Sequence, residues 1–174
     1  MDPANPVVRF DTALGSFRVE LYPRQAPLTV ANFLRYVREG RYREASFYRT
    51  VRSDNQPDSP VEIEVIQGGL GMEPHPLRLP PIEHETTDRT GLTHRDGTIS
   101  MGRLEPGTAA SEFFFCIGDQ PELDRGGHRN PDGQGFAAFG QAIEGLEVLR
   151  AIHRQPSVGQ YLDPPVPILA VVLE

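Results

Sequence analysis

An arginine and a glutamine, Arg49 and Gln67, are the polar side chains of this sequence best placed to act together. Residues Ser46–Val51 and Val61–Ile66 are rich in β-branched and aromatic types, so each is predicted to form a strand, with a polar, turn-forming loop between them. Side chains alternate between the two faces of a strand, so adjacent strands would put Arg49 beside Gln67 with Val65 next to it. This would give a fixed cation, an amide that orients it and an apolar contact. The alternative is an exposed arginine on a polar sheet face.

Two other patterns suggest different chemistry, and the sequence argues against both. Gly68–Gly71 has the glycine content of a phosphate-binding loop, but the proline-rich segment Met72–Pro81 follows it where a helix would be needed. These glycines are therefore expected to permit tight turning or close approach of another backbone. The histidines, among them His84 and His94, are scattered without metal-site spacing. We expect solvated loop histidines and no metal ion.

The elements that must position Arg49 and Gln67 begin with a hairpin and a helix. Val7–Asp11 and Ser16–Tyr22 are strand-like runs on either side of a turn at Leu14 and Gly15. Pro27 suits the first turn of a helix, and apolar residues at helical spacing follow it until Gly40. We expect this helix to cover an open end of a sheet or barrel.

A strand made largely of phenylalanine is expected at Glu112–Ile117. Alternation places Phe113 and Phe115 on one face and Glu112, Phe114 and Cys116 on the other. One aromatic set would fill the interior, while Phe114 on the outer face indicates an apolar pocket there. Alternatively, Phe114 packs beneath a loop.

The remaining segments complete an all-β (mainly β) chain with antiparallel strands. Further predicted elements are the strand Gly97–Met101, a flexible segment Gly102–Ala110, a long loop Gly118–Gly135, the strand Phe136–Ala142, a helix Gly145–Arg154 and the strand Val166–Leu173. Many short strands, two short amphipathic helices and frequent turns predict an antiparallel barrel or sandwich. The pattern alone does not choose between these two.

Composition limits the class of protein and its partners. The 174 residues are expected to form a single domain, 1–174, in which residues 1–6 are a loose tail. The net charge of −7 argues against nucleic acid or an anionic membrane as a partner. Cys116 is the only cysteine, so no internal disulfide forms. The first residues lack a signal-peptide pattern, which predicts a cytoplasmic protein as written, or a periplasmic one if a leader was removed.

Five blocks in order resemble the cyclophilin family of peptidyl-prolyl isomerases, with the closest likeness to short bacterial members. The blocks are Phe47–Arg49, Gln67–Gly69, Gly97–Met101, Ser111–Cys116 and Phe136–Gly140, within a resemblance that covers Val7 to Glu174. The resemblance implies a closed eight-stranded antiparallel barrel capped by two short α-helices. It also implies catalysis of rotation about X–Pro peptide bonds to assist protein folding.

The resemblance assigns roles to individual residues. Arg49 aligns with the family's catalytic arginine and Gln67 with its supporting glutamine. The resemblance implies that Phe114 and Leu123 form the proline pocket and that the backbone of Gly102 and Arg103 pairs with the substrate main chain. The full set of implied substrate contacts is Phe47, Val65, Gly102, Arg103, Glu112, Phe114, Leu123 and Phe136. No cofactor is implied. The expected partners are proline-containing peptides and unfolded protein clients, bound by a monomer.

Several positions depart from the family pattern. Glu112 replaces a glutamine, Glu64 a common pocket phenylalanine, and Phe136 stands where many members have histidine. We expect Glu112 to form a bidentate pair with Arg49 that orients it but weakens its positive potential. The chain has no tryptophan, which predicts weak inhibition by cyclosporin.

These departures keep two rival functions open. The first is a weakly active or non-enzymatic module that binds proline-containing segments, or assists folding, on the same fold. The second, more remote, is a carbohydrate-binding β-sandwich, which the lack of tryptophan argues against.

Overall fold

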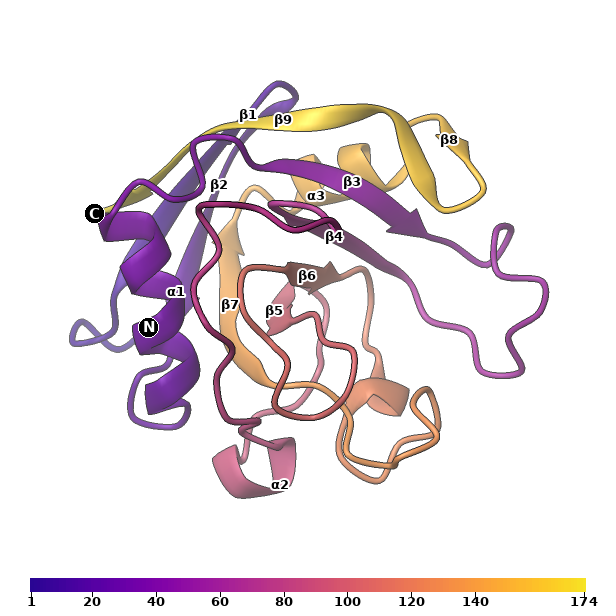
Figure 1. Cartoon of the computed structure of the whole chain (residues 1–174), viewed down its shortest axis with the longest axis horizontal. Coiled ribbons are helices and arrows are strands. Elements are labelled where there is room, and N and C mark those ends of the chain that lie inside the picture. Colours follow the sequence, from indigo (N-terminus) through magenta and orange to yellow (C-terminus); the bar gives the residue numbers. More distant parts are fainter.

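The protein is a closed antiparallel β-barrel with one additional short strand, seen in a computed structural model that describes residues 1–174 (Figure 1). The strands are β1 (Val7–Thr12), β2 (Gly15–Leu21), β3 (Ser46–Val51), β4 (Val65–Gly69), β5 (Thr98–Met101), β6 (Phe113–Cys116), β7 (Ala138–Glu144), β8 (Ser157–Val158) and β9 (Tyr161–Leu173). They follow the order β1-β2-β7-β5-β6-β4-β3-β9-β8, and pairing of β1 with β9 closes the barrel. The eight-stranded barrel is confirmed, with β8 appended to β9.

Two amphipathic helices contribute apolar faces to the barrel, and two shorter helical segments lie in its loops. These are α1 (Pro27–Arg38), α3 (Leu146–His153), α2 (Thr87–Thr90) and the 3-10 turn η1 (Pro121–Leu123). Phe33 of α1 and Ile152 of α3 are fully buried in the main core. None of the helices combines the length and the apolar character that crossing a membrane requires.

The barrel interior is filled by aromatic rings. Phe10 stacks on Phe17 with ring centroids 4.8 Å apart, and both meet the edge or face of Phe115. Phe113 and Phe115 point inward from β6, as strand alternation predicted. Such offset and edge-to-face contacts stabilise a core beyond the area they bury.

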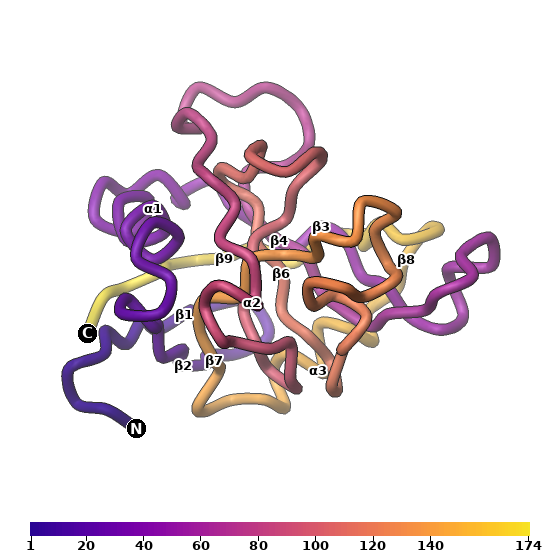
Figure 2. Tube along the Cα trace, turned by 90° about the horizontal axis from the view of Figure 1, so that it is seen from below, coloured from indigo at the N-terminus to yellow at the C-terminus, as the bar shows by residue number.

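A second apolar cluster lies outside the barrel wall, on the other face of β6. Its six buried members are Val51, Ile63, Val65, Phe114, Cys116 and Leu123, and Phe136 packs against them. Two long loops approach this face. Residues 52–64 extend on the side away from the chain termini, and residues 117–137 follow β6 (Figures 1 and 2). The outer wall of the barrel therefore carries its own small core.

Two strands begin four or five residues away from their predicted starts. The strand expected from Val61 begins only at Val65, because the amide of Gln56 pairs with both the N–H and the carbonyl of Ile63 and takes the place of a strand partner. The final strand begins at Tyr161 rather than Val166. Pro164 and Pro165 fall within the strand at the register shift against β3, where neither has a partner in that strand, so their missing N–H groups break no pairing there.

The chain termini lie on the same side of the barrel (Figures 1 and 2). The N–H of Glu174 donates to the carbonyl of Val7 at 2.9 Å. Residues 1–6, expected to be loose, are held by Glu20, whose carboxylate accepts from the N–H of Asp2 and the amide of Asn5, each at 3.1 Å.

Candidate active site

A β-bulge in β3 sets the direction of Arg49. Phe47 pairs with Gly68 and Arg49 with Gln67, so Tyr48 is an extra residue in the ladder. Without the bulge Phe47 and Arg49 would share a face; with it, Phe47 turns inward and Arg49 outward. Phe47 is fully buried in the main core and does not line the outer recess, which corrects its expected role in substrate contact.

Two amide side chains hold the Arg49 guanidinium. Its Nη1 donates to Gln67 Oε1 at 2.8 Å, as the predicted strand pairing requires. Its Nε and Nη2 donate to Gln160 Oε1 at 3.0 and 2.7 Å. Sequence reasoning missed Gln160, which lies 111 residues from Arg49 in the turn between β8 and β9. These three bonds leave two of the five guanidinium N–H groups free.

Arg49 remains cationic although it is partly enclosed. Burial lowers the pKa of the guanidinium below its ordinary value. An arginine nevertheless stays protonated near neutral pH. Its partners in the site are uncharged amides, so its positive charge is oriented but not neutralised.

Arg49 and Phe114 line one recess of ≈ 580 Å³ on the outer wall. Phe114 is 4% exposed, and Phe136 meets it edge-on with ring centroids 5.2 Å apart. Val65 and Leu123, both predicted to touch substrate, lie in the same apolar cluster and line the same recess. The structure thus brings a fixed cation to an apolar cavity.

Ile63, rather than Glu64, supplies the apolar side chain just before β4. Ile63 belongs to the outer cluster and lines the recess, whereas Glu64 does not line it. The carbonyl of Glu64 accepts from the N–H of Ile117, which extends the pairing with β6. The carboxylate at position 64 is therefore not a pocket substitution.

A buried histidine supports Phe114 from behind. The ring of His94 stacks on that of Phe114 with centroids 5.9 Å apart, and its nitrogens lie 2.7 Å from Asp124 Oδ1 and 2.8 Å from Ser100 Oγ. His94 is 2% exposed and Ser100 0% exposed, so this Ser–His–Asp set cannot reach a substrate. The expectation of a solvated loop histidine is wrong here, because Phe114 and Asp124 enclose the ring.

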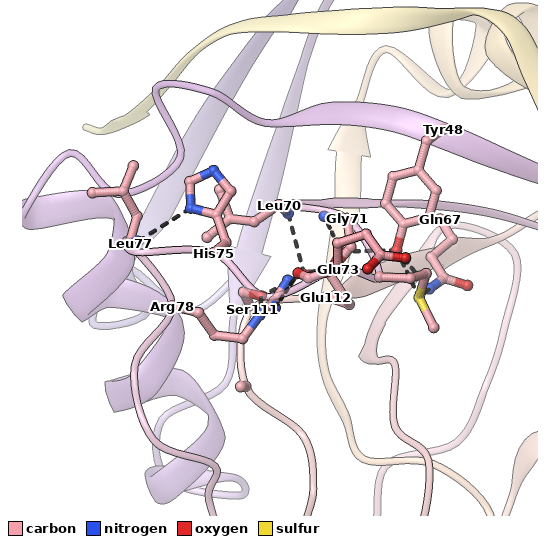
Figure 3. A network of polar contacts seen from close by, with 12 residues as sticks. Tyr48, Gln67, Leu70, Gly71, Glu73, His75, Leu77, Arg78, Ser111 and Glu112 are labelled. Carbon is pink, nitrogen blue, oxygen red and sulfur yellow. Dashed lines mark hydrogen bonds and ion pairs between the residues drawn. The ribbon is translucent and has the colours of Figure 1, made fainter.

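Glu112 does not pair with Arg49, which corrects the expected bidentate contact. Its carboxylate accepts from Tyr48 Oη at 2.8 Å and from the N–H groups of Leu70 and Gly71 at 3.2 and 2.8 Å. Ser111 Oγ also donates to it, and Arg78 Nη2 lies 3.5 Å away (Figure 3). The carboxylate occupies the space that a Cβ on Gly69 would fill.

A hydrogen-bond chain connects Glu112 indirectly to Arg49. Gln67 Nε2 donates to Tyr48 Oη at 2.9 Å, and Tyr48 in turn donates to Glu112. This fixes the Gln67 amide with its oxygen toward Arg49. Burial, reinforced by the Glu112 charge, raises the pKa of Tyr48 well above its ordinary value, so the phenol remains a donor.

The Gly102–Arg103 backbone forms an open edge beside the recess. The carbonyl of Gly102 and the N–H of Arg103 take part in no hydrogen bond of the fold. The Arg103 side chain is instead turned toward the loop, where it donates to the Gly135 carbonyl at 2.9 and 2.6 Å and lies over the Phe136 ring. An extended peptide could pair with this free backbone.

The arrangement orients a cation beside apolar side chains, but it holds no accessible nucleophile with a base. The structure also contains no group of three or more His, Cys, Asp or Glu side chains able to hold a metal ion. The chemistry it can perform is the stabilisation of a polar group held at the edge of an apolar recess.

Comparison with known proteins gives a consistent result. The family model described as cyclophilin type peptidyl-prolyl cis-trans isomerase/CLD matches residues 7–172. A peptidyl-prolyl cis-trans isomerase of Streptomyces antibioticus is 34% identical over 96% of this chain and 95% of its own. Peptidyl-prolyl cis-trans isomerase B of Escherichia coli is 31% identical over 84% of this chain and 83% of its own. A crystal structure of a Cryptosporidium parvum cyclophilin shares the fold, with a TM-score of 0.74 at 23% identity over 98% of each chain.

Proposed function

This chain belongs to the cyclophilin-type peptidyl-prolyl cis-trans isomerases, and from that premise we propose that Arg49 and Phe114 form the centre of its isomerase site. The observation that carries the proposal is that Arg49, fixed by Gln67 and Gln160, borders the recess floored by Phe114. The family's activity is rotation about X–Pro bonds, and each proposed role serves that rotation.

The reaction requires no covalent intermediate. Resonance makes the C–N bond partly double and sets a rotation barrier of about 18–20 kcal/mol. In the twisted state the lone pair is localised on the proline nitrogen and the C–N bond becomes single-like. A group that binds this state more strongly than the planar amide accelerates rotation in both directions.

Arg49 supplies that differential binding. Its two free N–H groups can donate to the proline residue of the bound peptide as the amide twists, and its charge strengthens the hydrogen bond. Gln67 and Gln160 hold the guanidinium before the substrate arrives, so little reorganisation is needed.

The apolar side chains hold the proline ring. Phe114, with Val65, Leu123 and Phe136, offers a surface for a ring that has no N–H to satisfy. The residue before proline is placed to pair with the free backbone at Gly102 and Arg103.

We extend the proposal to proline-containing peptides and unfolded protein clients as substrates. In support, a C. parvum cyclophilin has a crystal structure described as obtained in the presence of the dipeptide Ala-Pro. We also propose a monomer, since closure of the barrel between β1 and β9 leaves few unpaired strand edges.

The test measures exchange and binding on one proline peptide by NMR. We expect Arg49→Ala to slow exchange about a hundredfold or more while the peptide still binds through the apolar recess. Arg35→Ala, on the exposed face of α1, is the matched control and should exchange like the wild type. Equal exchange in wild type and Arg49→Ala would remove Arg49 from the mechanism. Binding without acceleration in the wild type would establish the non-enzymatic rival.

A further inference from the structure

Carboxylates neutralise the arginine side chains at only one end of the recess. Its lining contains a single carboxylate, Glu112, and four arginines: Arg49, Arg78, Arg103 and Arg129. Arg78 lies 3.5 Å from Glu112, and Arg103 lies 3.0 Å from Asp132. Neither Arg49 nor Arg129 is within ion-pair distance of any carboxylate. Two uncompensated guanidinium groups therefore face one cavity in a protein whose net charge is −7.

Arg129 is anchored at one nitrogen and free at the others. Its Nη1 lies 3.0 Å from Gln56 Oε1, 2.6 Å from Ser59 Oγ and 2.6 Å from the Val61 carbonyl. Its Nε and Nη2 have no acceptor, which leaves one edge of the guanidinium available for a bidentate contact with a carboxylate. Burial, and then the charge of Arg49, lower the pKa of Arg129. A bound anion would offset both effects.

The neighbouring residue adds a second donor without a partner. Asn130 also lines the recess, and its Nδ2 atom is buried with no hydrogen-bond acceptor. Buried amide donors without acceptors are uncommon because each costs about 1–3 kcal/mol. Both Arg129 and Asn130 therefore have N–H donors without an acceptor, and an anion at this end of the recess would supply one.

Arg129 lies at the opposite end of the recess from the open backbone edge at Gly102 and Arg103. It is hydrogen-bonded to residues just before β4, and Ile63 lines the recess there. Gly102 faces Glu112 and Gln67, farther along β4. The proline surface at Val65 and Phe114 lies between these two ends. If the residue before proline pairs with Gly102, the residue after proline extends toward Arg129.

We propose that this isomerase prefers substrates in which an acidic residue directly follows the proline, with its carboxylate received by Arg129. The inference rests on the proposed function, because it takes the proline position from that site. Arg129 acts here as a specificity-determining residue and not as a participant in bond rotation.

The first test needs no variant. Exchange is measured on end-blocked Ala-Ala-Pro-Glu, Ala-Ala-Pro-Gln and Ala-Glu-Pro-Gln peptides at low ionic strength. We expect kcat/KM to be about fivefold higher for Pro-Glu than for Pro-Gln, because one partly exposed ion pair contributes about that much. The two kcat/KM values should converge as salt is added. Equal values for these two peptides, or a preference for glutamate before proline, would overturn the proposal. Absence of catalysis on every peptide would instead reject the proposed function.

The second test asks whether the preference for the residue after proline follows the charge of the side chain at position 129. Arg129→Gln should abolish the Pro-Glu preference but keep activity on Pro-Gln, and Arg129→Glu should favour Pro-Lys over Pro-Glu. Arg125→Gln removes the same charge from the same loop, where Arg125 faces Asp88 outside the recess, and should keep the preference. Arg129→Lys keeps the charge and should keep part of the preference. Loss of the preference in Arg125→Gln as well would show a general charge effect and overturn the role of Arg129.

Discussion

At the scale of single residues, Gln160 is the side chain that completes the environment of Arg49. Its Nε2 donates to the Asn55 carbonyl at 3.2 Å, which turns its oxygen toward the guanidinium. The main-chain carbonyl of Gln160 accepts from the N–H of Thr50 at 2.8 Å, so the backbone of this turn is hydrogen-bonded to β3 as well. Gln160 acts through Arg49, and we describe it as a positioning residue.

Replacing Gln160 should therefore affect turnover more than binding. We expect Gln160→Ala to lower kcat about tenfold with little change in KM, because Arg49 gains alternative orientations. Gln160→Glu keeps the acceptor oxygens and should retain more activity than Gln160→Ala. The measurement is the rate of peptide exchange together with the NMR signal of the Arg49 Nε–H group, which should broaden or shift in Gln160→Ala. A change in KM alone would assign Gln160 to substrate binding.

Glu112 acts on the structure around the site, since its carboxylate contacts Tyr48 and two backbone N–H groups instead of Arg49. We expect Glu112→Gln to destabilise the fold by about 1–3 kcal/mol, because an amide cannot accept from both Leu70 and Gly71 while also accepting from Tyr48. Activity per folded molecule should change little. The measurements are urea unfolding and peptide exchange.

Glu105→Gln provides the matched control for this carboxylate. Glu105 is exposed and its side chain makes no hydrogen bond, so the same change of charge should leave the unfolding free energy unaltered. A large rise in exchange rate for Glu112→Gln, at unchanged stability, would restore the idea that Glu112 weakens the potential of Arg49.

At the scale of elements, the end of β4 depends on glycines that admit other groups closely. A Cβ on Gly68 would lie 2.9 Å from the Phe47 ring, and one on Gly69 would lie 2.7 Å from the Glu112 carboxylate. Close approach of a backbone, as expected, is found at Gly68, where the Ser46 carbonyl oxygen would lie 2.9 Å from the Cβ; at Gly69 the approaching group is a side chain. Gly69 also has a φ of +138°, which L-residues rarely adopt.

Gly69→Ala and Gly71→Ala separate backbone strain from loss of space. Gly71 has a φ of +103° but nothing within 4 Å of its would-be Cβ. Both variants should be strained, and we expect Gly69→Ala to lose about 1–3 kcal/mol more, because the Glu112 carboxylate must leave its donors. Thermal unfolding compares the two. Equal losses would show that strain alone sets the cost.

At the scale of the whole molecule, acidic pH should weaken the fold. Hydrogen bonds from Arg9, Arg35, Arg103 and Arg18 hold the pKa values of Asp11, Glu39, Asp132 and Glu174, respectively, below their ordinary values. For each of these groups the folded state binds protons less readily than the unfolded state. Their contribution to stability is present above the ordinary pKa values of 3.8 and 4.5, and it is lost as the pH falls through the lower folded values.

We therefore predict a Tm that is steady between about pH 7 and pH 5.5 and falls progressively below about pH 4.5. These carboxylates are exposed or, for Asp11, half-buried, so added salt should reduce the fall. The measurement is a set of thermal unfolding curves across this range at two salt concentrations. A Tm that rose on acidification below pH 4.5 would contradict the prediction.

Much of this molecule follows from local sequence pattern. Alternation within Phe113–Cys116 separated the interior rings from Phe114, and helical spacing after Pro27 located α1. The pairing of Arg49 with Gln67 followed from two strands being adjacent. The five ordered blocks indicated the family. These features depend on residues close in the chain, or on a pairing that the strand pattern itself requires.

Other features were decided only by the tertiary structure, because they depend on one-residue shifts or on distant loops. The bulge at Tyr48 sent Phe47 inward, and no sequence pattern marked it. Gln160 and Arg129 reach the site from turns whose course depends on packing against other strands. The sequence by itself determined the antiparallel strands and the pairing of Arg49 with Gln67, and its family resemblance indicated the closed barrel. The folded chain decided which neutral groups hold the Arg49 cation and where positive charge remains uncompensated, since side chains far apart in sequence meet only after the barrel closes.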